Sequence, residues 1–154
     1  MRTDILLVTP QNDEESLQIL KIAQALGLPY LVSAQPHGAR LHLEPELVQA
    51  IIESHHERVA IVENPSVEAE GQLADAGKEV IIIDHHRYEE FNRMQIKSSL
   101  EQFLEVFEVT EVDLVDSGFD PAMVAAVAAL DRGFVWELRK LGYSKTEYER
   151  AIDY

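Results

Sequence analysis

The chain has 154 residues and carries 28 acidic side chains against 13 lysines and arginines, which gives a formal net charge of -15 at pH 7. This length predicts one domain spanning residues 1–154, and the absence of cysteine excludes disulfides and thiolate chemistry. The acid excess, without a cluster of basic residues, argues against duplex DNA as a partner, and no apolar run approaches the ~20 residues that span a membrane.

Short apolar runs alternate with amphipathic segments along the first half of the chain. Runs bounded by proline, glycine or polar residues predict strands at residues 5–10, 30–32, 59–62 and 80–83. Helical spacing and capping residues predict helices at residues 13–26, 45–55 and 66–76. This alternation is typical of a parallel sheet.

The second half of the chain is expected to be mainly helical. Helices are predicted at residues 98–107, from Asp120-Pro121 to about Leu130, and along the tail after a break near Gly142. Residues 112–115 form a short apolar run that predicts a fifth strand. The fold class predicted is therefore α/β, with three layers: a mainly parallel five-stranded sheet and helices on both of its faces.

Polar side chains follow three of the predicted strands, where ligands bind in parallel α/β sheets. The sharpest group is Asp84-His85-His86, which leaves the most apolar strand. Histidine nitrogen and carboxylate oxygen are ordinary ligands for Mn, Zn or Fe, although two histidines can also simply end a strand. The other polar strand ends are at residues 11–13 and 63–64.

The segment at residues 76–86, AGKEVIIIDHH, resembles the DHH phosphoesterase family, which is named for the Asp-His-His tripeptide. That family includes single-strand exonucleases, phosphodiesterases of nanoRNA and cyclic dinucleotides, and exopolyphosphatases. The resemblance covers about residues 4–134 and implies a DHH-like parallel α/β domain with two divalent metal ions, usually Mn²⁺. It also implies a smaller C-terminal domain that binds substrate.

The first motif of the family, His-x-Asn-Pro-Asp-x-Asp, is only partly present. Pro10 and Asp13 match it, but Leu7 stands at the histidine position and Gln11 at the first aspartate position. Glu63 stands where the family has the aspartate of its second motif. The fourth motif, Asp-Thr-Gly-x-Phe, resembles residues 131–134, DRGF, in which phenylalanine comes one place early.

The resemblance implies that one metal site has lost two ligands and that the other keeps Asp13, Glu63, His85 and Asp131. It therefore predicts at most one tightly bound ion, Mn²⁺ or Mg²⁺. Two of these residues have plain structural alternatives, because Asp13 could cap a helix and Asp131 could be an ordinary surface residue.

The resemblance also assigns roles beside the metal. Asp84 would orient His85, and His86 would contact the phosphate of the substrate. Ser16 could contact phosphate through the start of the first helix, or could be an ordinary first-turn serine.

Two classes of function are open at this point. The first is a phosphoesterase, dependent on a divalent metal, that acts on a small phosphate ester or short nucleotide. The second is a catalytically inactive DHH-like module that binds or regulates, and a chance tripeptide in a plain α/β domain is a third interpretation. Only 23 residues follow Asp131, so the substrate-binding domain is expected to be absent. A second copy of the chain could then close the site, as a homo-oligomer. Without a signal-peptide pattern, a cytoplasmic location is expected.

Overall fold

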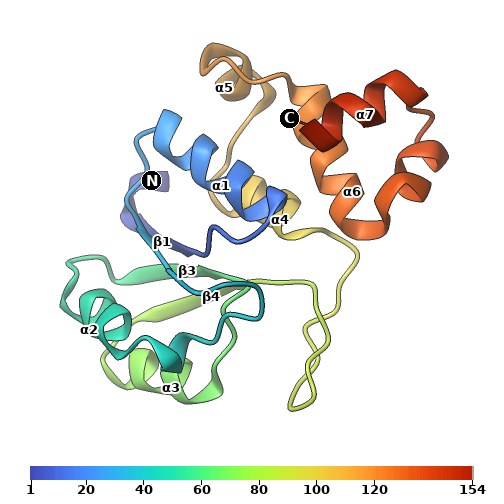
Figure 1. The fold of residues 1–154 in the computed structure, drawn as a ribbon. Helices are drawn as coiled ribbons and strands as arrows, with labels where there is room; N and C mark the ends of the chain where they lie inside the picture. The colour runs from blue at the N-terminus through green and yellow to red at the C-terminus, as the bar shows by residue number, and fades with distance from the viewer. Residues whose placement is uncertain (154) are drawn as a thin grey trace.

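A parallel sheet of four strands lies at the centre of the fold (Figure 1). Our computed structural model describes residues 1–153, apart from the side chains of residues 134–139 and 148. The strands are β1 (Ile5–Thr9), β2 (Tyr30–Val32), β3 (Arg58–Val62) and β4 (Glu79–Ile83), in the order β2-β1-β3-β4. The prediction of an α/β fold built on a parallel sheet is therefore confirmed. The side chain of Phe134, which the fourth-motif resemblance includes, and residue 154 lie outside what is described.

The described chain also contains seven α-helices and two short 3₁₀ turns (Arg2–Asp4 and Leu41–Leu43), joined by loops. The helices are α1 (Glu14–Ala25), α2 (Pro45–Glu53), α3 (Val67–Asp75), α4 (Ser99–Val106), α5 (Glu111–Asp116), α6 (Pro121–Lys140) and α7 (Lys145–Asp153). Asp13, Ser66 and Ser98 cap α1, α3 and α4, because each side chain accepts a backbone N–H of the first turn. In the described part of the chain no helix combines the length and apolarity needed to cross a bilayer.

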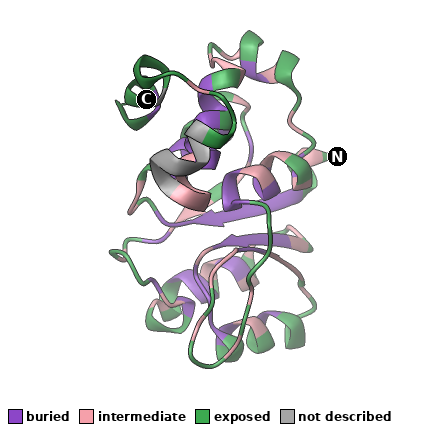
Figure 2. Cartoon of the chain, turned by 90° about the vertical axis from the view of Figure 1, so that its right-hand side faces the viewer, coloured by how far each residue is buried: buried purple, intermediate pink, exposed green. Residues whose placement is uncertain are grey.

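The core consists of two clusters divided by the sheet. Successive side chains of a strand point to opposite faces, so Leu7 packs with α1, α4 and α6, whereas Leu6 and Val8 pack with α2 and α3. Phe103 of α4 and Phe107, which follows the end of α4, are fully buried in the first cluster. Figure 2 shows the buried residues on the strands and on the inner sides of the helices, with exposed residues outside.

The prediction of a fifth strand at residues 112–115 is wrong, because this segment lies in α5. The Thr110 hydroxyl accepts the backbone N–H of Asp113, and the Asp113 carboxylate accepts the backbone N–H of Thr110, which starts a helix. Val112 and Val115 are 68% and 59% exposed, while Leu114 is buried. Only Leu114 of these three apolar residues faces the core, as expected for a short amphipathic helix and not for a buried strand.

The ends of β3 and β4 lie side by side and set the position of the candidate site. Val62 pairs with Ile83 in parallel register, and the backbone N–H of Glu63 donates to the carbonyl of Ile83 at 3.0 Å. Glu63 and Asp84 therefore leave neighbouring strands at the same edge. The helix α4 packs against β4, and α1 packs against both α4 and α6, so two strand ends and three helices converge there.

Candidate metal centre

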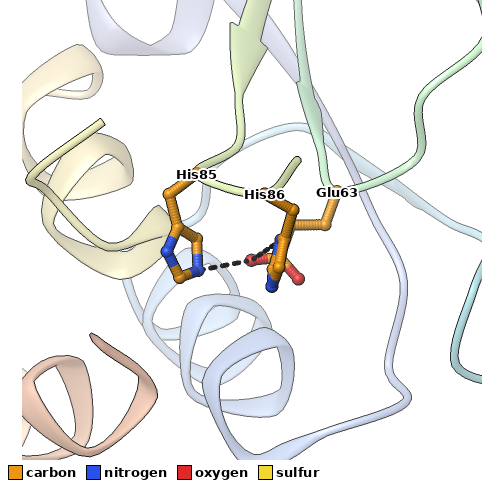
Figure 3. A group of neighbouring side chains, drawn as sticks. All are labelled: Glu63, His85 and His86. Atoms are coloured by element: carbon orange, nitrogen blue, oxygen red, sulfur yellow. Dashed lines mark ion pairs between the residues drawn. The ribbon is translucent and has the colours of Figure 1, made fainter. Parts of the chain in front are cut away.

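Four ionisable side chains from different elements meet at this edge of the sheet. Glu15 comes from α1, Glu63 follows β3, His85 follows β4 and Asp131 lies on α6; their ligand atoms all fall within 4.8 Å of one another. The Nε2 atom of His85 lies 2.5 Å from Asp131 Oδ2, 3.5 Å from Glu63 Oε1 and 3.8 Å from Glu15 Oε2. Figure 3 shows His85 and His86 both turned toward Glu63.

Three of these ligand atoms are buried without a hydrogen bond. They are Glu15 Oε2, His85 Nε2 and Asp131 Oδ2, the last two lying close together but without the angles of a hydrogen bond. The side chain of Glu15 is only 2% exposed and that of His85 10%. An unpaired buried polar group costs about 1–3 kcal/mol, and a cation placed between these atoms would give each of them a partner.

The start of α4 holds two of the carboxylates in place. The backbone N–H of Leu100 donates to Glu15 Oε1 at 2.6 Å, and the Ser99 hydroxyl donates to Glu63 Oε1 at 2.6 Å. Glu63 also has a φ of 41°, in the left-handed region that non-glycine residues seldom adopt. Such hydrogen bonds orient ligand side chains before a metal binds, and backbone strain of this kind clusters at functional sites.

Crowding of charged groups shifts the pKa values in this cluster. Burial, with Asp131 close by, raises the pKa of Glu15 to about 10. Burial alone would lower the pKa of His85, but the close carboxylates of Asp131 and Glu63 raise it to about 10. Burial would raise the pKa of Asp131, but His85 and Glu15 hold it below its usual range. At neutral pH the metal-free site therefore keeps protons on Glu15 and His85.

These protons predict that divalent metal binding strengthens as the pH rises. Because Glu15 and His85 carry raised pKa values without metal, an ion must displace their protons to bind. The association constant for Mn²⁺ should increase about tenfold per pH unit for each proton released, between about pH 6 and about pH 8. Calorimetric titrations in buffers of different ionisation enthalpy measure both the association constant and the number of protons released. An association constant that stays flat over this range, with no proton release, would contradict the expectation.

Asp84 contacts His86, whereas the family resemblance implies that it orients His85. The buried Asp84 Oδ1 accepts the backbone N–H of His86 and lies 3.1 Å from His86 Nδ1, while Oδ2 accepts the Tyr88 hydroxyl at 2.8 Å. Although burial would raise the pKa of Asp84, these hydrogen bonds lower it. The Asp84 carboxylate in turn raises the pKa of His86. Asp84 is thus saturated with partners, and the side chain of His86 is 43% exposed.

Asp13 and Ser16, both expected in the site, are engaged in starting α1. Asp13 Oδ1 accepts the backbone N–H of Ser16 at 2.7 Å, and the buried Ser16 hydroxyl accepts the backbone N–H groups of Asn12 and Asp13. Asp13 belongs to neither group of converging ligand atoms, so its role in the structure is that of a helix cap. Leu7 lies inside β1, fully buried, whereas Gln11 is exposed.

Glu15 is the member of the cluster that the sequence interpretation missed. It shares a helix face with Ile19 and Ile22, at spacings of four and seven residues, and both of these are fully buried. An acidic residue on the core-facing stripe of an amphipathic helix was the available signal. Asn64, expected at the strand end, is also buried, and neither polar atom of its side chain has a hydrogen bond.

A polar cavity of about 230 Å³ borders the cluster on the side of Glu63 and His86. Its other lining residues come from three loops and are Asn12, His37, Gly38, Ala39, Arg87 and Tyr88. Among the described residues Arg87 has no ion pair, whereas Arg40 pairs with Glu90 and Arg93 with Glu70. An unpaired guanidinium in so acidic a chain gives this cavity a donor suited to phosphate oxygens.

Comparisons of the chain with family models, curated proteins and solved structures find no match.

Proposed function

We propose that this chain is a DHH-like domain that holds one Mn²⁺ or Mg²⁺ ion and, with it, binds and hydrolyses a small phosphate ester or short nucleotide. The ion would lie between Glu15, Glu63, His85 and Asp131. The observation that carries the proposal is the convergence of three buried ligand atoms that have no hydrogen bond. Three carboxylates and one imidazole form a donor set that suits Mn²⁺.

One ion fits the donors better than two. The second group of converging ligands, Glu63, His85 and His86, shares two members with the first. The Nδ1 atom of its third member, His86, already lies against Asp84 Oδ1 at 3.1 Å. Leu7 is enclosed in the core and offers no ligand, so the first site of the family has no counterpart for its histidine.

The residues around the ion have separate tasks in this proposal. A bound divalent ion supplies Lewis-acid polarisation of a phosphate oxygen. His86, held by Asp84, faces the polar cavity together with Arg87 and His37 and can donate to the other phosphate oxygens. The resulting contacts would fix the phosphate beside the cluster and neutralise its charge against the acidic chain.

A binding module without turnover is the second candidate. It is favoured by Leu7 and Gln11, because they replace two ligands that the family uses for its other ion, and two-metal catalysis stabilises attacking and leaving oxygens together. In this alternative the same cluster holds an ion and a phosphate-bearing ligand, but the ligand is released unchanged.

Hydrolysis of bis-p-nitrophenyl phosphate and of a dinucleotide with Mn²⁺ tests the proposal. The wild type should show Mn²⁺-dependent turnover, and His85→Ala should lower it by about a hundredfold or more, since it removes a ligand. His55→Ala is the matched control, because His55 is exposed and lies outside the cluster. Mn²⁺-dependent binding of a dinucleotide without turnover would instead favour the binding module. Turnover that His85→Ala leaves unchanged would exclude this site as its source.

A further inference from the structure

A second cavity, of about 290 Å³, opens from the same metal centre between α1, α6 and α7. It shares Glu15 and Asp131 with the cluster, so the cluster forms its polar end. Apart from Glu14, its remaining walls are apolar and comprise Val127, Leu130, Ala151 and Ile152. The two cavities therefore border one cluster but differ in character, the first being lined with donors and the second with hydrocarbon.

The apolar walls are held in place by the packing of α7 on α6. Ala151 is 2% exposed and packs with three residues of α6, namely Met123, Ala126 and Ala129. The Tyr143 hydroxyl, in the connection between the two helices, donates to the carbonyl of Ala122 at 3.3 Å. Because small side chains bring the helices together, Ile152 is placed beside the pocket while half of its surface stays exposed.

We propose that this cavity binds the apolar, aromatic alcohol portion of a phosphate ester whose phosphate lies at the metal centre. The proposal rests on the proposed function and narrows its substrate to aryl or similarly apolar phosphate esters. Burial of an aromatic ring against four apolar residues gains about 25 cal/mol per Å² of apolar surface. A polar sugar would leave its hydroxyls without partners on these walls.

The size and polarity of the cavity support a small ligand oriented in one way. Its volume lies near the lower end of the range for small-molecule sites, about 300–1,000 Å³, which accommodates a ring and excludes a polymer. Its polar end carries Glu15, whose buried Oε2 has no hydrogen bond. A phosphate cannot approach these carboxylates without a cation between them, so the anionic end of the ligand belongs at the ion and the ring in the cavity.

Amide NMR titrations test the apolar site separately from the metal. Phenol added to the metal-free protein should shift the amide signals of Val127, Leu130, Ala151 and Ile152. With Mg²⁺ present, phenyl phosphate should bind about tenfold or more tightly than inorganic phosphate, because only the former buries a ring. Ile152→Ser should weaken phenyl phosphate about fivefold and leave inorganic phosphate unchanged. Leu141→Ser is the matched control, since Leu141 is 53% exposed against 50% for Ile152 and does not line the cavity.

Each outcome bears on one of the two proposals. Phenol that shifts none of the four amides overturns the apolar site, whether or not Mg²⁺ binds. Equal affinities for phenyl phosphate and inorganic phosphate, with Mg²⁺ bound, also overturn it while leaving the metal centre intact. Phenol that occupies the cavity of a protein that does not bind Mg²⁺ instead refutes the proposed function and the placement of the phosphate, and supports only the site for the ring.

Discussion

Replacing His85 with alanine should weaken Mn²⁺ binding by about a hundredfold or more, because loss of even an outer-shell partner costs about 10–100-fold. His85 Nε2 is the only nitrogen in the cluster of Glu15, Glu63, His85 and Asp131, and it lies within 4 Å of all three carboxylates. Its removal also leaves those carboxylates to repel one another when they ionise. Isothermal titration with Mn²⁺ measures the effect directly.

The control for this variant is His55→Ala, which removes an exposed imidazole outside the cluster. It should bind Mn²⁺ as the wild type does. Circular dichroism on both variants reports whether the fold is kept, so that a loss of binding can be assigned to the ligand. Wild-type affinity in a folded His85→Ala protein would rule out His85 as a ligand.

Replacing Leu7 with histidine should destabilise the fold by about 3–5 kcal/mol, since it removes buried hydrocarbon and buries an unpaired polar ring. Leu7 is fully buried in the middle of β1, where it pairs with Tyr30 on one side and Ala60 on the other. The family resemblance suggests that Leu7→His with Gln11→Asp would restore a second metal site. The position of Leu7 inside a central strand argues against that outcome.

Urea unfolding of the two single variants separates these effects. Gln11→Asp is the control, because Gln11 is exposed and a surface substitution should change the free energy of unfolding by no more than about 0.5 kcal/mol. A stable Leu7→His protein, together with binding of a second Mn²⁺ by the double variant, would show that position 7 reaches the metal centre after all.

Most of the fold could be predicted because local signals and burial agree in these segments. The four strands are apolar runs ended by polar residues or proline. Asp13 and Ser66 cap helices as predicted, and Ser98 caps the helix predicted at residues 98–107. The strand prediction for residues 112–115 failed because it relied on β-branched residues, which favour strands. In the structure the cap at Thr110 starts a helix instead. The sequence also predicted an end to α6 near Leu130, but the helix continues to Lys140.

The candidate site was predicted in part, since Glu63, His85 and Asp131 do come together. Glu63 and His85 could be found because parallel strands bring their carboxyl ends to one edge. The helical pattern could have placed Glu15 on the buried face of α1, but not in the cluster, because its position there depends on a hydrogen bond from Leu100, 85 residues away. The role of Asp84 was missed for a similar reason, because the partner that fills its second oxygen, Tyr88, belongs to the loop beyond the tripeptide.

The most direct measurement of the central claim is anomalous diffraction from crystals soaked in Mn²⁺. A single Mn²⁺ ion at this cluster should give one strong anomalous peak within bonding distance of Glu15, Glu63, His85 and Asp131, and this peak should be lost in crystals of His85→Ala. The absence of a peak between these four side chains, or two fully occupied ions in the wild type, would contradict it.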